Sequence, residues 1–134
     1  KAITLKEGSD ITIITTGSMV YYSLEAATLL EEQGVSATVI DMHTIKPLDT
    51  GIINKACQGV KLIVTIEEHS IIGGLGGAVA EYKSTLKNAP PQLTIGIPDE
   101  FGHAGDYPFM LNKYGLTSEK IAKTIIEKVK VDHT

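Results

Sequence analysis

The sequence predicts an α/β protein, a three-layer α/β/α sandwich with about five strands, mostly parallel with one antiparallel strand. Segments rich in β-branched residues alternate with segments that repeat apolar residues at helical spacing, along the whole chain. Several strand-like segments are apolar on both faces, which is typical of parallel strands covered by helices on each side. Because βαβ crossovers are right-handed, this alternation places helices on both faces of one sheet. We expect a single domain over residues 1–134.

The strands are recognised by short runs of Ile, Val and Thr between turn residues. The predicted strands are residues 3–5, 10–16, 36–42, 61–66 and 92–97. A tight turn at Gly8-Ser9 separates the first two runs, so we expect the first strand to be an antiparallel neighbour of the second.

Capping residues mark the helices. The predicted starts are Ser18, Asp49, the glycine-rich loop 73–77, Asp106 (before a short helix over 107–114) and Thr117, and the predicted ends include Gly34 and Gly115. Apolar residues at helical spacing are expected to face the core, namely Val20, Leu24, Ala27, Leu30, Ile52, Ile53, Ala56, Leu75, Val79, Tyr82, Leu86, Ile121, Ile125 and Val129.

Composition excludes several classes of protein. The chain has 43% hydrophobic and 21% charged residues, an ordinary globular composition. Its net charge of −4, without a block of like charges, provides no surface for a nucleic-acid backbone. No apolar run approaches the ~20 residues of a membrane span. One cysteine, Cys57, permits no internal disulfide, and we expect a cytoplasmic protein without nucleic-acid or membrane partners. Because the chain lacks an initiator methionine, we expect a part of a longer polypeptide.

The run Glu67-Glu68-His69 is the strongest candidate for catalytic chemistry in the sequence. It follows a core strand, at the edge where open α/β sheets bind ligands. A carboxylate beside an imidazole can move protons near neutral pH. Neighbouring residues at a strand end point in different directions, however, and no nucleophile accompanies them. The favoured interpretation is therefore structural, with carboxylates that cap backbone donors or pair across an interface, and catalysis is the alternative.

The glycine loop, Gly73-Gly74-Leu75-Gly76-Gly77, opens a helix, and helix N-termini bind anions. It lacks the third small residue of a dinucleotide fingerprint, and no acid ~20 residues on could hold a ribose. We favour glycines that allow close packing against another surface, and an anion- or nucleotide-binding regulatory module is the alternative. The histidines at 43, 69, 103 and 133 lack metal-ligand spacing, Cys57 suits a small buried position, and a solvated side chain is expected for Lys46.

Several motifs follow one another in order: Gly-Ser-Asp-Ile-Thr-Ile-Ile-Thr-Thr-Gly-Ser at 8–18, Thr-Ile-Lys-Pro-Leu-Asp at 44–49, Val-Thr-Ile-Glu-Glu-His at 64–69 before Gly73, Ile-Pro-Asp-Glu-Phe-Gly at 97–102, and Tyr-Gly-Leu-Thr at 114–117. Together they resemble the C-terminal domain of the transketolase family of thiamine-diphosphate enzymes. The run from Glu67 to Gly76 is most similar to transketolase, or to the smaller subunit of split transketolases. Deoxyxylulose-phosphate synthase and the β subunit of 2-oxoacid dehydrogenases, which usually depart from His69, are the alternatives.

This resemblance implies a domain without catalytic, cofactor-binding or metal residues, inactive in isolation. Thiamine diphosphate and Mg²⁺ would be held by an N-terminal diphosphate-binding domain and a middle pyrimidine-binding domain, in the same chain or a separate subunit. The whole enzyme would transfer a two-carbon ketol unit between sugar phosphates, as a homodimer or heterotetramer. The residues expected at an inter-domain or inter-subunit contact are Glu67, Glu68, His69, Gly73, Gly74, Gly76 and His103.

Overall fold

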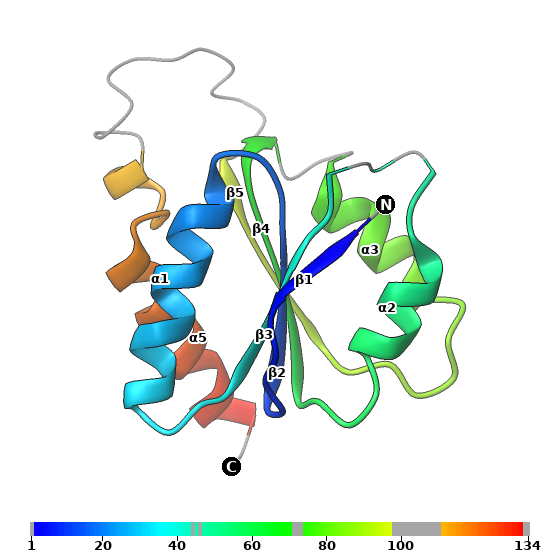
Figure 1. Ribbon diagram of the computed structural model, residues 1–134, viewed down its shortest axis with the longest axis horizontal. Helices are drawn as coiled ribbons and strands as arrows, with labels where there is room; N and C mark the ends of the chain where they lie inside the picture. Colours follow the sequence, from blue (N-terminus) through cyan, green and yellow to red (C-terminus); the bar gives the residue numbers. More distant parts are fainter. Residues whose placement is uncertain (1, 44, 46, 71–73, 98–110, 133–134) are drawn as a thin grey trace.

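The computed structural model describes residues 2–43, 45, 47–70, 74–97 and 111–132. In this part of the chain a central sheet is covered by helices on both faces (Figure 1). The strands are β1 (Ile3–Lys6), β2 (Ile11–Thr15), β3 (Ala37–Asp41), β4 (Leu62–Ser70) and β5 (Gln92–Ile97). The helices are α1 (Met19–Glu32), α2 (Thr50–Ala56), α3 (Leu75–Lys83) and α5 (Ser118–Asp132). The predicted three-layer architecture is confirmed.

The sheet has five strands in the order β1-β3-β2-β4-β5. Strands β2, β3, β4 and β5 pair in parallel, and β1 is antiparallel. The antiparallel first strand is thus confirmed, but its expected neighbour was wrong, because β1 pairs with β3 instead of β2. The turn passes beneath β3, where the Gly8 amide donates to Thr38 Oγ1 at 2.9 Å. A Cβ at position 8 would overlap the backbone of Ala37, so glycine permits this crossing.

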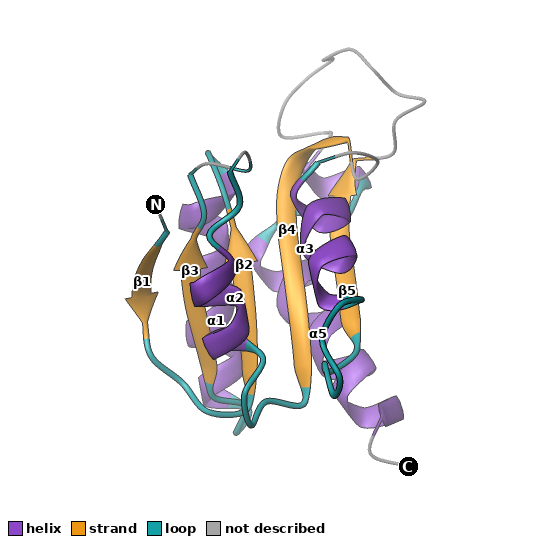
Figure 2. Ribbon diagram, turned by 90° about the vertical axis from the view of Figure 1, so that its right-hand side faces the viewer, coloured by secondary structure: helices purple, strands orange, loops and turns teal. Residues whose placement is uncertain are grey.

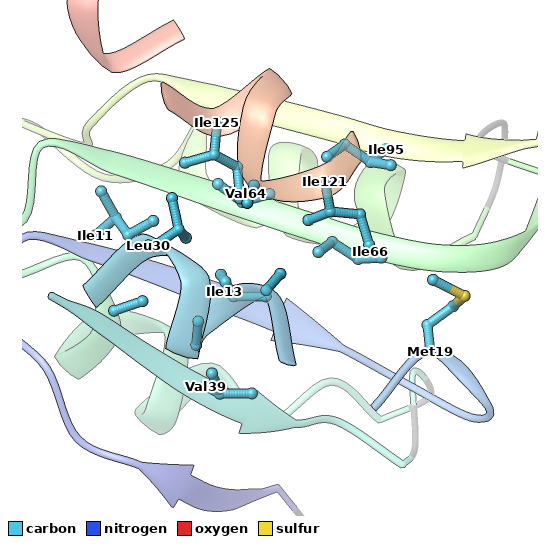
Figure 3. Close-up of a cluster of buried hydrophobic side chains, with 14 of the residues drawn as sticks. Ile11, Ile13, Met19, Leu30, Val39, Val64, Ile66, Ile95, Ile121 and Ile125 are labelled. Atoms are coloured by element: carbon cyan, nitrogen blue, oxygen red, sulfur yellow. The ribbon is translucent and has the colours of Figure 1, made fainter. Parts of the chain in front are cut away.

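Two apolar clusters fill the space between the layers. The cluster beneath α1 and α5 (Figure 3) joins strand residues Ile11, Ile13, Val39, Val64, Ile66 and Ile95 to helix residues Met19, Leu30, Ile121 and Ile125. The opposite cluster joins Ile14, Ile40 and Ile63 to Ile53, Leu75 and Val79 of α2 and α3. Strand residues alternate between the clusters, as the two-residue period of a strand requires.

Helix α1 buries part of the predicted face, since Ala27 and Leu30 are buried as expected and Leu24 packs against the core cluster. Its buried residues are Met19, Ser23, Ala26, Ala27 and Leu30. Val20 and Leu24 are only partly buried, because the small side chains of Ala26 and Ala27 form the side that lies against the sheet. The inward face of α5 is as predicted, with Ile121 and Ile125 buried and Val129 packed against them. Leu86 lies beyond the end of α3.

Most of the predicted helix boundaries are confirmed. Asp49 Oδ1 accepts from the Ile52 amide at 3.3 Å, and Thr117 Oγ1 accepts from the Lys120 amide at 3.3 Å. Gly34 and Gly115 follow their helices with φ of 85° and 72°, the left-handed conformation expected there. Ser18 makes no side-chain cap bond, since its own backbone is helical and α1 starts with a tight backbone turn.

Most of the short helix predicted for residues 107–114 lies outside the described residues. Residues 111–113 of that segment are described, and they are helical.

Glu25 joins α1 to the start of α5. Its carboxylate accepts from Ser118 Oγ at 2.6 Å and from the Tyr21 hydroxyl at 2.8 Å. These two hydrogen bonds lower the pKa of Glu25 below its ordinary value. Among the described residues, no helix has the length and apolar character that crossing a bilayer requires.

Candidate functional site

The run Glu67-Glu68-His69 lies inside strand β4, which continues to Ser70. The prediction that the strand ends at residue 66 was therefore wrong. Polar side chains suggested a strand end, but the pairing with β5 resumes at Ser70 and Ile97 after a register shift that follows Ile66. The irregularity is of the kind that redirects side chains at the end of a sheet. It occurs where β4 approaches the start of α3.

Glu67 is the cap of helix α3, although it is distant from that helix in sequence. Its side chain is 2% exposed. Oε1 accepts from the Leu75 amide at 2.9 Å, and Oε2 accepts from the Gly76 amide at 2.8 Å. The N-cap position itself is Gly74, which has no side chain to offer. A carboxylate at a helix N-terminus is favoured by both the free amides and the helix dipole. The capping interpretation is thus confirmed for Glu67.

Gly76 holds α3 close to the sheet. A Cβ at this position would lie 2.6 Å from Thr94 Cγ2, closer than real contacts allow, and 3.0 Å from Thr65 Oγ1, which is a tight contact. The Gln92 side-chain amide donates to the Gly76 carbonyl at 3.0 Å, with longer contacts of 3.4 Å and 3.3 Å to the Thr65 and Thr94 hydroxyls. Lys83 Nζ donates to Gln92 Oε1 at 3.4 Å. We call these residues, with Glu67, the α3 corner.

The structure brings together only some of the predicted contact residues. Glu67 and Gly76 meet in the α3 corner, and Gly74 precedes them with an ordinary φ of −97°. Glu68 is half-buried. The His69 side chain, Gly73 and His103 lie outside the described part of the chain, as does Lys46. The sequence did not point to Thr65, Gln92 or Thr94 as members of this site. For Thr65 a signal was available, because a polar threonine inside a buried strand needs a hydrogen-bond partner.

The α3 corner has consequences for anion binding. The amides that a phosphate would use at the start of α3 already donate to Glu67. A carboxylate in that position also repels an incoming anion. The geometry therefore disfavours the nucleotide-binding alternative at this helix.

The remaining candidate side chains have ordinary environments. His43 Nδ1 lies 3.3 Å from Asp41 Oδ2, on side chains that are both partly exposed. Burial raises the pKa of the Cys57 thiol, and the nearby positive charge of Lys83 only partly opposes this effect. A thiol with a raised pKa is a poor nucleophile at neutral pH. Within the described ranges, no group of three or more His, Cys, Asp or Glu side chains could hold a metal ion.

The fold and the α3 corner define a class of protein, an α/β domain in which a buried strand carboxylate caps the start of α3. The particular family follows from comparison with known proteins. The family model of the transketolase C-terminal domain matches residues 1–121. The chain belongs to this family.

Named relatives agree with this assignment. A protein of Methanocaldococcus jannaschii named putative transketolase C-terminal section is 48% identical over 126 residues, which are 94% of this chain and 39% of the relative. One of the subunits of an apulose-4-phosphate transketolase of Phocaeicola vulgatus is 45% identical over 97% of this chain and 41% of its own length. A 1-deoxy-D-xylulose-5-phosphate synthase of Caldanaerobacter subterraneus is 38% identical over 97% of this chain and 21% of its own length.

A solved structure described as a split-gene transketolase, inactive beta4 tetramer, superposes with a TM-score of 0.86 at 39% identity, over 95% of this chain and 41% of that one. A Pichia stipitis transketolase mutant, at 24% identity and a TM-score of 0.68, shares the fold. The chain thus spans about two fifths of the length of the split-transketolase proteins that it matches.

Proposed function

We propose that this chain is the C-terminal domain of a larger transketolase-type enzyme, which transfers a two-carbon ketol unit between sugar phosphates in the cytoplasm. The observation that carries this proposal is the family match over residues 1–121 together with the limited share of each relative that the chain covers. The domain would act indirectly, by positioning a reaction centre that other domains form. It is expected to be inactive in isolation.

The described residues do not fit a thiamine-diphosphate site. They contain no cluster of metal ligands, and the start of α3 is capped by Glu67. We therefore assign the cofactor and its Mg²⁺ to the N-terminal diphosphate-binding and middle pyrimidine-binding domains. Those domains belong either to the same polypeptide or to a second one, in a homodimer or a heterotetramer. The names of the relatives, one a C-terminal section and the other a single subunit of a transketolase, support a divided enzyme.

The proposed contact with these domains is formed by Glu68, His69, Gly73, Gly74 and His103. Glu67 and Gly76 support this contact through their effect on α3, because both are buried within this domain. A rigid helix start loses little conformational entropy on docking, which favours association. The α3 corner supplies that rigidity.

Reconstitution tests the proposal. The purified chain is assayed for ketol transfer from a ketose phosphate to an aldose phosphate, alone and with the missing domains supplied as a second polypeptide. Activity and tight thiamine-diphosphate binding are expected only in the mixture. Turnover by the chain alone, or a mixture that neither assembles nor turns over, contradicts the proposal.

A second candidate parent enzyme is a 1-deoxy-D-xylulose-5-phosphate synthase, because several such proteins are 38% to 43% identical to this chain. The reconstituted enzyme distinguishes the two by its product. Formation of 1-deoxy-D-xylulose 5-phosphate would favour the second candidate and leave the role of this domain unchanged.

A further inference from the structure

A groove lies on the α2 face of the sheet, beside its outer edge. Strand β1 forms that edge, beyond β3 (Figure 2). Helix α2 has seven residues and is too short to cover these two strands completely. The uncovered space has a volume of about 130 Å³. We call it the α2 groove, and its lining includes Glu7, Thr12, Thr38, Ile40, Ile52 and Lys55.

The floor of the α2 groove presents hydrogen-bond acceptors. Thr12 Oγ1 donates to the Ala56 carbonyl at 3.0 Å, and Thr38 Oγ1 donates to the Gly8 carbonyl at 2.9 Å. A hydroxyl has a single proton to donate, so both oxygens have only lone pairs left for a ligand. Thr38 also accepts from the Gly8 amide, which leaves it one lone pair. A ligand group at the floor must therefore be a hydrogen-bond donor.

Two opposite charges line the same groove. Glu7 follows β1, and Lys55 lies in the last turn of α2. Both side chains are exposed, and the ion pairs formed among the described residues include neither of them. A ligand with a single charge is attracted to one of these groups and repelled by the other. A ligand that carries both a cationic and an anionic group matches both.

The size of the α2 groove limits the ligand further. A cavity of about 150 Å³ holds one benzene molecule, so a groove of this volume accommodates about six non-hydrogen atoms. Its apolar lining is aliphatic, from Ile40, Ile52 and Val60. These side chains provide contact for a methyl or methylene group. The ligand is therefore small, doubly charged and partly aliphatic.

We propose that the α2 groove binds a small α-amino acid of about the size of alanine. An ammonium group offers three donors, which match the two threonine oxygens of the floor and the carboxylate of Glu7. The ligand carboxylate pairs with Lys55, and the ligand methyl group contacts the aliphatic lining. A bound amino acid would join β1, β3 and α2, so its concentration would control the stability of this part of the domain. The inference goes beyond the proposed function and does not depend on it.

NMR titration of the 134-residue chain with L-alanine tests the site. The amide shifts of residues 7–12, 38–40 and 55–60 should change together, with a dissociation constant of about 1 mM or below. Ethylamine lacks the carboxylate and propionate lacks the ammonium, and each should bind at least about ten-fold more weakly. Unchanged shifts of these residues at about 50 mM alanine overturn the inference, as does equal binding of the three compounds.

Matched variants test the two charges. Glu7→Gln and Lys55→Met should each weaken alanine binding by about ten-fold or more, because each removes the partner of one ligand charge. Both positions are exposed, so the variants are expected to fold, and their NMR spectra check this. Glu81→Gln, an exposed carboxylate on α3, is the control and should change binding less than about two-fold. Equal affinities of the Glu7 and Glu81 variants contradict the proposed site.

Thermal unfolding provides a second readout. Alanine should raise the Tm of the unaltered chain, because it binds the folded state, and should have no such effect on the double variant Glu7→Gln and Lys55→Met. A rise of the same size in both proteins would report a general effect of the solute on protein surfaces. That result would refute a specific site in the α2 groove.

Discussion

The α3 corner and strand β1 differ in how completely their side chains are covered within the domain. In the α3 corner the buried Glu67 carboxylate accepts from the amide of Gly76, and the carbonyl of Gly76 accepts from the Gln92 side chain. These bonds connect strands β4 and β5 to helix α3. On β1, the aliphatic side chains of Ile3 and Leu5 are about half exposed. Glu67, which looks chemical in the sequence, is therefore an internal support, whereas Ile3 and Leu5, which look like core residues, are about half exposed.

The largest effect should come from Gly76→Val in the α3 corner. The added side chain would overlap Thr94 Cγ2 and Thr65 Oγ1, so α3 must move away from the sheet. We expect a loss of about 3 kcal/mol in the free energy of unfolding, measured by urea denaturation. Gly77 provides the control, because a Cβ there meets nothing within 4 Å. Gly77→Ala should stabilise the chain by about 0.5–1 kcal/mol, and equal losses at both positions would show that packing is not the cause.

Replacing the buried carboxylate should have the next largest effect. Glu67→Gln keeps one acceptor but turns a side-chain donor toward one of the amides of Leu75 and Gly76. The expected loss is about 2 kcal/mol in the free energy of unfolding, since charge-assisted bonds are lost in a buried site. The exposed Glu81→Gln on the same helix should change stability by less than about 0.5 kcal/mol. Identical urea midpoints for the two variants would rule out Glu67 as the principal cap.

A smaller effect is expected where the start of β1 is attached to the N-cap of α2. Asp49→Ala removes the cap of α2 and the acceptor for the Ala2 amide. We expect a loss of about 1 kcal/mol in the free energy of unfolding, typical of an N-cap. Hydrogen exchange at residues 2–6 should also become faster, while exchange in α3 stays the same. Unchanged exchange in β1 would indicate that its pairing with β3 is sufficient to hold it.

The smallest effect on stability is expected from the double variant Ile3→Ser and Leu5→Ser in the isolated chain. Both side chains are about half exposed, so little apolar area is returned to water on substitution. The free energy of unfolding should fall by less than about 1 kcal/mol. A loss as large as that of Gly76→Val would mean that β1 is part of the core, and the contrast between the two regions would disappear. Thermal unfolding of the purified variants is sufficient to decide.

Local patterns predicted much of the fold. The β-branched runs identified all five strands, and Asp49, Thr117, Gly34 and Gly115 identified helix ends, because capping depends on residues a few positions apart. The partner of β1 could not be predicted in the same way. The turn at Gly8 suggested a hairpin, and the contact with Thr38 that redirects it joins residues 30 positions apart.

The candidate site likewise combines features that local sequence predicts with features that depend on long-range contacts. Glu67 was recognised as a capping residue by type and place, but its partners depend on how α3 docks on β4. The contribution of Thr65, Gln92 and Thr94 requires the pairing of β4 with β5, which no local pattern contains. Whether the predicted contact residues Glu68, His69 and His103 meet a partner domain stays a prediction.

The sequence by itself determined the class of fold, the positions of its elements and the family, because these depend on hydrophobic period, turn chemistry and ordered motifs within short segments. The tertiary structure alone decided that Glu67 faces inward to α3 and that Ile3 and Leu5 face outward. Both outcomes depend on long-range packing. A side chain becomes a cap or a surface only when a distant segment covers it or leaves it uncovered.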